Sequence, residues 1–275
     1  MRSHVFGGDA FIWEMDADGG SEQRLTPAGR YPVWSPDGSR FAFIRIRTGP
    51  GDLPGNVRVM VMDANGTDLH SVGSVESNLF GPPMWSPDGS QVALNASVAC
   101  GTHPVQGMAI IDVRTHEQKA VCLKGMGLRE AFFRSWSSTG LIAFIRDTGS
   151  IGTMTPTGRH VGLITPKGVR ARDLDWSPDG RHLVWSTAFA DDEIFVMGRR
   201  GGHVRRLTGP HPFPESGVSD SGPAYSPNGE RIAFERCCYG EHKTYEIFVM
   251  YADGSHLRRL THRRTSDGLP NWQPR

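Results

Sequence analysis

The sequence predicts an all-β fold: a six-bladed β-propeller of four-stranded antiparallel blades. The first observation is a short strand that ends in an aromatic residue and, in its best copies, is followed by the turn SPDG. The six aromatic residues are Trp34, Trp85, Trp136, Trp176, Tyr225 and Trp272. Consecutive copies are therefore 51, 51, 40, 49 and 47 residues apart, a period typical of a propeller blade rather than of a helical repeat. The second observation is that alternating apolar runs follow the copies in a constant order.

The first strand of each blade, A, ends at the aromatic residue. In SPDG, proline fixes φ at the second turn position, aspartate suits the third and glycine closes a type I turn at the fourth. The copy at Trp136 continues as SSTG and is one residue shorter before Leu141, so we expect a distorted turn there without loss of the blade. We expect all six aromatic residues to pack between adjacent blades rather than against a ligand.

Three further strands, B, C and D, follow each A strand. B strands are expected in the runs that begin at Phe41, Val92, Leu141, His182 and Arg231. C strands are expected in the runs that begin at Val57, Met108, Glu193 and Glu246. D strands are expected in RRLT at Arg205 and Arg258, and in the related segments at Gln23 and Val161. Alternation with β-branched and aromatic residues is typical of strands, and DADG at Asp16 and DANG at Asp63 predict C–D hairpins.

The two ends of the chain predict how the ring closes. The N-terminal segment, residues 3–26, contains B, C and D strands without an A strand, and the C-terminal segment, residues 268–275, contains an A strand alone. We expect the C-terminal A strand to pair with the N-terminal strands, which would complete a sixth blade and hide the edge strands. Residues 1–275 would then form a single propeller domain, with no linker and no second fold.

Composition excludes some classes of function. The 275 residues include 30 Lys and Arg against 29 Asp and Glu, a net charge of +1, so neither a nucleic acid nor an anionic membrane is indicated as a partner. No apolar stretch is long enough to span a bilayer. The first residues, MRSHVFGG, lack the apolar region of a signal peptide.

Four cysteines leave the redox state open. Cys237 and Cys238 are adjacent, and they either form a vicinal disulfide or stay as thiols. Cys100 and Cys122 fall in the same predicted blade, where they are able to approach each other. Four reduced cysteines and at least one disulfide are equally open alternatives.

The long loops predict where a ligand binds. D–A and B–C loops open on one face of a propeller around the channel, and here they are long and irregular, whereas the A–B and C–D turns are short. Because a rigid scaffold positions such loops for recognition, we expect the binding surface at the channel mouth on the D–A/B–C face. The candidate ligand-binding residues of this face are Arg30, Arg134, Arg172, Asp173, Asp220, Asp267, His103, His211, His242 and His262.

Motifs for catalysis or metal binding are weak. The loop histidines come from separate loops and none has HExxH spacing, so we expect no metal and no cofactor. GxSxG does not occur, and no catalytic residue is assigned. Asp173 and Asp175 are the acidic pair that a strand would place on one face.

The SPDG turn with its preceding Trp, the EIFVM strand and the RRLT strand together resemble the TolB-type, WD-like propeller repeat over essentially the full chain. The resemblance implies a six-bladed ring without the α/β domain that precedes the propeller in TolB. It also implies an extracytoplasmic location, periplasmic or secreted, with a cytoplasmic one left open. The wider group includes partner-binding proteins, propellers of prolyl-oligopeptidase-type enzymes, and oligogalacturonate lyases with a metal-binding histidine cluster.

Two functional hypotheses follow. The first is a binding module that recognises a protein or peptide segment at the channel mouth; it rests on the complete ring, the variable loop face and the lack of a catalytic motif. The second is a lyase- or hydrolase-type enzyme, metal-assisted or metal-free, that acts on a small or sugar-like substrate in the channel. Its basis is the mixed Arg, Asp and His lining, which is suited to neutralising a carboxylate and moving a proton. The first hypothesis is favoured.

Overall fold

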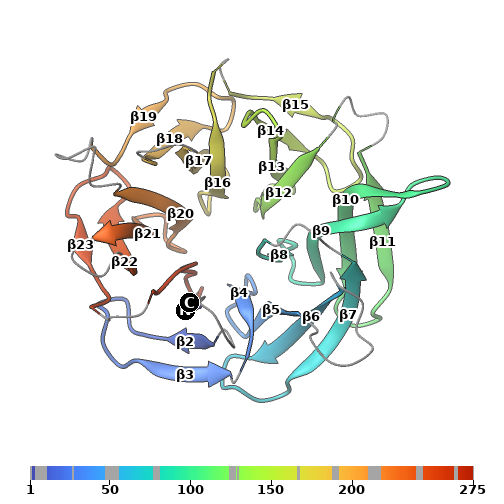
Figure 1. Cartoon of the computed structure of the whole chain (residues 1–275), viewed down its shortest axis with the longest axis horizontal. Helices are drawn as coiled ribbons and strands as arrows, with labels where there is room; N and C mark the ends of the chain where they lie inside the picture. The colour runs from blue at the N-terminus through green and yellow to red at the C-terminus, as the bar shows by residue number, and fades with distance from the viewer. Residues whose placement is uncertain are drawn as a thin grey trace.

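In the computed structural model, sheets surround a common centre (Figure 1). The structure describes residues 2–3, 11–26, 28–46, 56–76, 81–123, 128, 130–165, 168–187, 192–209, 218–239, 244–262 and 266–274. Within these residues every regular element is a β-strand. Among them, no helix has the length and apolar character needed to cross a membrane.

Five of the sheets are four-stranded antiparallel blades, whose strands run in chain order from the centre outwards. Blade 1 contains β4 (Arg30–Trp34), β5 (Arg40–Ile46), β6 (Asn56–Asp63) and β7 (His70–Glu76). Blade 2 contains β8 (Met84–Trp85), β9 (Gln91–Ala99), β10 (Pro104–Asp112) and β11 (Gln118–Cys122). Blade 3 contains β12 (Ala131–Trp136), β13 (Ile142–Arg146), β14 (Ile151–Met154) and β15 (Gly162–Leu163). Blade 4 contains β16 (Ala171–Trp176), β17 (His182–Thr187), β18 (Ile194–Gly198) and β19 (Arg205–Arg206). Blade 5 contains β20 (Ser219–Tyr225), β21 (Arg231–Tyr239), β22 (Thr244–Tyr251) and β23 (Arg258–Arg259).

The expected number of four-stranded blades, six, is wrong: the described residues form five. The remaining sheet, which we call the N-terminal sheet, has three strands, β1 (Arg2–Ser3), β2 (Ile12–Glu14) and β3 (Gln23–Thr26). The C-terminal segment, residues 266–274, was expected to supply its A strand but contains only an isolated bridge residue, Gly268. Two causes are local: Pro270 and Pro274 have no N–H to donate to a ladder, and Leu269 leaves the extended conformation with a φ of 56°. The expected partners Val5 and Phe6 lie outside the described residues.

The C-terminal segment nevertheless bonds to the sheets on both sides, beside β2 and β4 (Figure 1). The side-chain oxygen of Asn271 accepts the backbone N–H of Trp34 in blade 1 at 2.9 Å. The indole N–H of Trp272 donates to the carbonyl of Ala224 in blade 5 at 3.1 Å. The segment therefore joins the last blade to the first through side chains rather than through a ladder.

The same two bonds join A strands elsewhere in the ring. Asp175, which also precedes its blade's aromatic residue, accepts the N–H of Tyr225 in the next blade at 2.9 Å. The indole of Trp85 donates to Val33 O in the preceding blade at 2.9 Å. The C-terminal segment thus makes the contacts of an A strand without forming one.

The prediction that the aromatic residues pack between blades is confirmed. Six hydrophobic clusters occur among the described residues, and each contains one of these aromatic residues. Trp34, for example, packs with Ile12 of the N-terminal sheet and with Phe41 and Phe43 of blade 1. At the closing contact, Trp272 packs with residues of blade 5 and with Met15.

The turns after the aromatic residues form the expected bond. In a full SPDG copy, the N–H of Gly38 donates to Ser35 O at 2.9 Å. The expected distortion at Trp136 is small, because Gly140 N donates to Ser137 O at the same 2.9 Å. The hydroxyls of Ser137 and Thr139, 2.9 Å apart, replace the Ser–Asp bond of the other copies, so the turn tolerates the change of sequence.

The two arginines of RRLT have separate roles. The first arginine reaches the C–D turn of the next sheet: Arg205 donates to Asp253 O at 2.7 Å and Arg258 to Ala17 O at 3.4 Å. The second arginine binds a glutamate of its own blade, as Arg206 binds Glu193 at 3.3 Å. The motif therefore both completes its blade and holds the following one.

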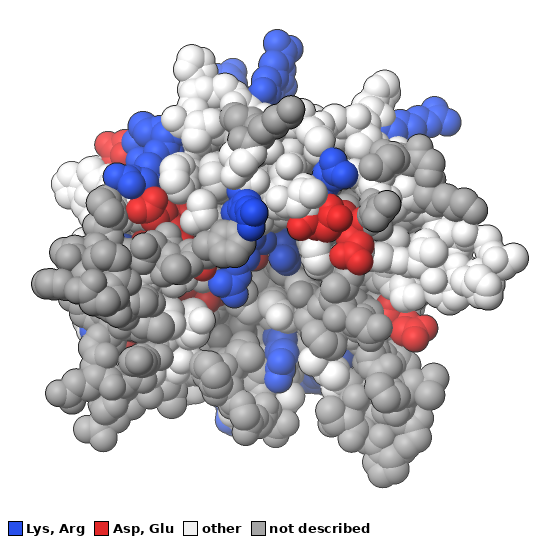
Figure 2. All heavy atoms as spheres, turned by 45° about the horizontal axis from the view of Figure 1, so that its top comes forward, with Lys and Arg blue, Asp and Glu red and all other residues white. Residues whose placement is uncertain are grey.

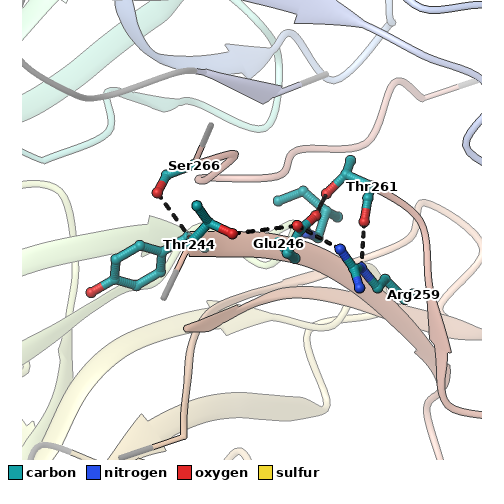
Figure 3. Close-up of polar contacts among 7 residues, drawn as sticks. Thr244, Glu246, Arg259, Thr261 and Ser266 are labelled. Atoms are coloured by element: carbon teal, nitrogen blue, oxygen red, sulfur yellow. Dashed lines mark hydrogen bonds and ion pairs between the residues drawn. The ribbon is translucent and has the colours of Figure 1, made fainter. Parts of the chain in front are cut away.

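Figure 3 shows this arrangement in blade 5, around the buried carboxylate of Glu246. Arg259 donates to Glu246 Oε1 at 2.6 Å, and the hydroxyl of Thr261 donates to Oε2 at 2.7 Å. The backbone N–H of Tyr245 donates to the hydroxyl of Ser266 at 3.1 Å. These bonds fix the chain as it leaves blade 5 for the D–A side of the ring.

One disulfide resolves part of the redox question. Cys100, directly after β9, is bonded to Cys122 at the end of β11, within blade 2. Cys237 in β21 is also disulfide-bonded. The side chain of Cys238 lies outside the described residues. The alternative of four reduced cysteines is therefore wrong.

The closing contact gives a first prediction. Replacing Asn271 with Ala should lower the free energy of unfolding by about 1–2 kcal/mol, because the N–H of Trp34 would lose its acceptor in a partly buried position. Urea unfolding followed by tryptophan fluorescence measures the change. Lys119→Ala is the control; Lys119 is exposed in β11, and we expect a loss below about 0.5 kcal/mol. Equal losses for the two variants would contradict the role of Asn271.

Candidate functional site

Charged side chains from different blades meet on the D–A/B–C side of the ring, near the starts of the innermost strands. Lys and Arg side chains lie next to Asp and Glu side chains toward the middle of the face in Figure 2. The charges are mixed rather than gathered into a patch of one sign, as the net charge of +1 leads one to expect. We call this group, Tyr31, Arg134, Arg172, Asp173, Asp192 and Glu235, the mouth cluster.

Asp173 lies between two arginines. Its Oδ1 is 3.7 Å from Nη2 of Arg134 in blade 3, and its Oδ2 is 3.8 Å from Nε of Arg172, its neighbour in β16. A register shift in β16 between Ala171 and Asp173 turns this part of the strand away from regular pairing. Both separations exceed hydrogen-bond length, so Asp173 is near two cations without being tightly bound to either.

Arg172 has a firmer partner in Asp192. Its Nη1 lies 3.2 Å from Asp192 Oδ2, and the same oxygen accepts the hydroxyl of Ser219 at 2.8 Å. Asp192 is nearly buried, whereas 52% of the Arg172 side chain is exposed. The guanidinium is therefore held at its inner edge and open at its outer edge.

Tyr31 reaches the cluster from a strained backbone. It has a φ of 57°, which is costly for a residue with a Cβ, and lies where β4 shifts register between Arg30 and Val33. Strain of this kind is retained when the surrounding structure requires it and is concentrated at functional sites. The strained backbone therefore makes Tyr31 a candidate member of a functional site.

Electrostatics place four charged residues around the Tyr31 hydroxyl. Burial raises the pKa of Tyr31. The positive charges of Arg30 and Arg134 oppose this rise in pKa. The negative charges of Asp173 and Glu235 add to it. The hydroxyl is thus protonated at neutral pH and available as a donor.

Glu235 enters the cluster through a gap in the innermost strand. It belongs to β21, but β20 bulges between Ser221 and Ala224, and a Cβ on Gly222 would lie only 2.9 Å from Glu235 Oε1. Gly222 also has a φ of 58°, so this position needs glycine for both reasons. The absence of a side chain there lets the Glu235 carboxyl lie against the inner strand.

Glu235 also contacts the C-terminal segment. Its Oε1 accepts the backbone N–H of Leu269 at 2.7 Å. Desolvation raises the pKa of Glu235 to about 7, and the charge of Asp173 adds to the rise. The bond from Leu269 and the charge of Arg172 act in the opposite direction. Glu235 therefore changes its charge near neutral pH while it holds the closing segment.

Asp175 lies on the same strand as Asp173 but has a different environment. It accepts the hydroxyl of Ser135 at 2.8 Å and the backbone N–H groups of Trp176 and Tyr225, each at 2.9 Å. Desolvation raises its pKa to about 6, although these bonds favour the charged form. Asp175 thus joins the A strands of blades 3, 4 and 5. It stabilises the contacts between blades and is not part of the mouth cluster.

The structure brings some of the predicted site residues together. Arg134, Arg172 and Asp173 are in contact, and Arg30 lies close enough to influence Tyr31. His103 and His262 are exposed in their loops. His211 and His242 lie outside the described residues.

The structure removes Asp220 and Asp267 from contact with solvent. Both are fully buried, with 0% exposure. Asp220 forms a bidentate pair with Arg236, with distances of 2.6 and 2.8 Å. The backbone N–H of Asp267 donates to Tyr245 O at 2.8 Å. Both aspartates therefore act inside the fold in this structure and are not open to a ligand.

Metal binding gains no support from the described part of the chain. Within it, no three His, Cys, Asp or Glu side chains are arranged so that they could hold a metal ion. Two clefts, of about 840 and 790 Å³, lie at turns on the opposite, A–B/C–D side, around Trp272 and around His203 respectively.

Sequence reasoning missed Tyr31, Asp192 and Glu235 as members of the cluster. Glu235 lies in an ordinary B strand, and only the bulge opposite allows it to approach the mouth. The glycine and proline of SGPAY, within an A strand, were the available signal for that bulge. No comparable signal marks Tyr31, because the charges around its hydroxyl come mainly from three other blades.

Two relatives were found among curated proteins, and no protein-family model matches the chain. An uncharacterized protein from Agrobacterium fabrum is 27% identical over 238 residues, which cover 84% of this chain and 74% of that protein. The Tol-Pal system protein TolB from Anaeromyxobacter dehalogenans is 30% identical over 108 residues, 35% of this chain and 20% of that protein.

Solved structures agree on the fold. TolB from Acinetobacter baumannii matches with a TM-score of 0.77 and 19% identity, over 97% of this chain and 63% of that one. A candidate TolB from Agrobacterium tumefaciens matches with a TM-score of 0.69 and 19% identity, over 92% and 90%. An oligogalacturonate lyase from Vibrio parahaemolyticus matches with a TM-score of 0.56 and 12% identity, over 92% and 70%. The chain thus has a TolB-like β-propeller fold and spans less than two thirds of the Acinetobacter TolB.

The raised pKa of Glu235 gives a second prediction. Because the folded state holds this proton to about pH 7 and the unfolded state releases it near 4.5, the wild-type free energy of unfolding should fall between those pH values. Glu235→Gln keeps an acceptor for Leu269 and removes the titration. We expect this variant to be more stable than wild type at pH 8 by about 1–3 kcal/mol and to lose less stability between pH 4.5 and 7.

Urea unfolding at a series of pH values tests this expectation. The matched control is Glu230→Gln, an exposed glutamate in the A–B turn of blade 5, which should leave the pH profile of wild type unchanged. A Glu235→Gln profile parallel to that of wild type would show that the carboxyl does not titrate as described.

Proposed function

We propose that residues 1–275 act as a single propeller that binds an extended segment of a protein or peptide at the mouth cluster. The observation that carries this proposal is the convergence of Tyr31, Arg134, Arg172, Asp173 and Glu235 from four different blades. A rigid ring fixes the distances between these blades. Donors and acceptors at fixed spacing are suited to recognising the polar groups of a chain laid across them.

The exposure of Arg172 supports this binding mode. Half of its side chain is accessible, while Asp192 and Ser219 fix its inner edge. A guanidinium held in this way loses little conformational entropy on binding and presents its remaining N–H groups to a partner. We therefore expect Arg172 to contribute most of the binding free energy for a partner.

The fold similarities support a protein partner. The neighbours with the two higher TM-scores are described as TolB or as a candidate TolB, and the curated TolB relative is described as a Tol-Pal system protein. A propeller of this kind that binds a protein is consistent with the mixed charge of the mouth cluster, which favours specificity over strong nonspecific attraction.

The disulfide supports an extracytoplasmic location. Structural disulfides persist in oxidising compartments and are rare in the cytosol. The Cys100–Cys122 bond, together with the oxidised state of Cys237, fits a periplasmic or secreted protein.

A second candidate function rests on Glu235. A carboxyl with a pKa of about 7, beside the hydroxyl of Tyr31 and the charge of Arg172, is suited to moving a proton during lyase- or hydrolase-type chemistry on a small or sugar-like acid. The discriminating variant is Glu235→Gln. It should abolish turnover if Glu235 is catalytic. If the protein is a binding module, the variant should still bind peptide, with an affinity changed by the loss of one charge of the mouth cluster.

Peptide binding at Arg172 is the third prediction. Peptides selected from a random display library against wild type should bind Arg172→Ala at least about tenfold more weakly in calorimetry, since an accessible charged hydrogen bond would be lost. Arg181→Ala is the matched control: Arg181 is an exposed arginine in the A–B turn of blade 4. Arg181→Ala should keep the wild-type melting temperature, and Arg172→Ala should lower it only modestly, because Asp192 keeps the hydrogen bond from Ser219. Failure to select any peptide, or equal affinity for Arg172→Ala and wild type, would overturn the proposal.

A further inference from the structure

Arg134 is a largely enclosed cation with little compensation. Only 17% of its side chain is exposed. Its Nε is buried and has no hydrogen-bond partner among the described residues. Its ion pair with Asp173 is 3.7 Å long, beyond hydrogen-bond length. A buried donor without an acceptor costs about 1–3 kcal/mol, more when charged, so this arrangement calls for a further acceptor.

Neighbouring groups hold Arg134 where it is. A Cβ on Gly81 would lie 3.1 Å from Nη1 of Arg134, so the guanidinium packs against this glycine. β12 itself is fixed from blade 2, because Phe133 N donates to Asn95 Oδ1 at 2.8 Å and Gln106 donates to Ala131 O at 2.8 Å. On the other side of Arg134, the hydroxyl of Ser135 donates to Asp175 Oδ1 at 2.8 Å. The strand is therefore anchored on both sides of Arg134, and movement of the backbone offers no easy route to a better partner.

Asp173 cannot satisfy Arg134 alone. It is also 3.8 Å from Arg172, which is already bonded to Asp192. Among the described residues, Asp192 compensates Arg172, whereas the carboxylate next to Arg134 is the loosely held Asp173, which Arg172 shares. The charge of Arg30 lies near the same place, as its effect on Tyr31 indicates. The charge of Glu235 is also close to Tyr31, so what distinguishes Arg134 is its loose ion pair and its unbonded Nε rather than an excess of positive charge.

We propose that Arg134, together with the hydroxyl of Tyr31, forms a subsite for a carboxylate. This inference deepens the proposed function and rests on it: the segment bound at the mouth is acidic, and an Asp or Glu side chain or a chain terminus occupies this position. The guanidinium of Arg134 donates to the carboxylate, and the O–H of Tyr31 supplies a second donor. A planar guanidinium matches the two oxygens of a carboxylate, which a neutral amide does not reproduce.

The strained backbone of Tyr31 has a role in this subsite. Its φ of 57° places the side chain among charges from other blades rather than along the regular strand. Such a conformation persists where a fixed side-chain position is needed. The proposal accounts for both unusual features, the enclosed Arg134 and the strained Tyr31, by one ligand group.

Glutarate, a dicarboxylate, is the probe, and glutaramide is its uncharged counterpart. In the ¹⁵N-labelled full chain, the Nε–H resonance of Arg134 is identified by its absence in Arg134→Lys. We expect glutarate to shift this resonance with saturation, with no such response from glutaramide or at the Nε–H of Arg181. Glutarate should also raise the melting temperature of wild type, and its affinity should fall about tenfold or more in Arg134→Lys, which keeps the charge but loses the planar fork.

Tyr31→Phe separates a site from a structural effect. It removes the hydroxyl and keeps the ring, so glutarate affinity should fall while the melting temperature without ligand stays near that of wild type. If Arg134→Lys does not fold, the glutarate affinity of Tyr31→Phe still decides the question. An Arg134 response no larger than that of Arg181, or an equal response to glutaramide, would overturn the subsite.

The outcome is distinguishable from failure of the proposed function. Peptides that bind at Arg172 while glutarate leaves Arg134 unaffected would support the binding module and overturn the carboxylate subsite. Glutarate bound at Arg134 without any peptide binding would support the subsite and overturn recognition of a protein segment.

Discussion

Packing between neighbouring sheets is the constraint on which the whole molecule depends. Each sheet has apolar residues on both faces, and a ring buries both faces of every sheet. The wedge between two sheets is filled by the aromatic residue that ends each innermost strand, and polar bonds from Asp175, Asn271 and the first arginine of RRLT connect the same neighbours. The repeat in the sequence is thus chiefly a repeat of contacts between sheets.

This constraint determines the chemistry of the mouth. Because the innermost strands are fixed by their seams, the residues at their starts converge at set distances, although they come from distant parts of the chain. Local departures from regular strands add to this effect. Register shifts in β4 and β16 occur at Tyr31 and Asp173, and the register shift in β20 leaves space for the Glu235 carboxyl to approach the centre. The ring fixes where the innermost strands start, and the bulges determine which side chains point toward the mouth.

Sequence patterns were sufficient to predict the aromatic contacts between blades and the hairpins within them. The aromatic positions and most B and C strands follow from local alternation and turn composition, which depend on few residues. β14 was missed because DTGSIGTM has little alternation. The three strands of the N-terminal sheet were expected, but its lack of a fourth strand was not, because side-chain bonds of Asn271 and Trp272 replace a ladder. Within the site, the arginines and Asp173 were expected, but Glu235 was not, because its environment is created by Gly222 and Leu269 from other segments.

Glu235 also has a consequence for communication within the ring. One oxygen of its carboxyl holds Leu269 of the closing segment, while the charge of the same group is felt by Asp173 and Tyr31. A change at the mouth that alters the ionisation of Glu235 therefore affects its bond to Leu269, and a change at Leu269 affects the mouth. Thermodynamic reciprocity makes this coupling equal in both directions. A ligand bound at the centre would change how readily the C-terminal segment detaches from the ring, and the rate at which a protease cleaves that segment would report ligand binding.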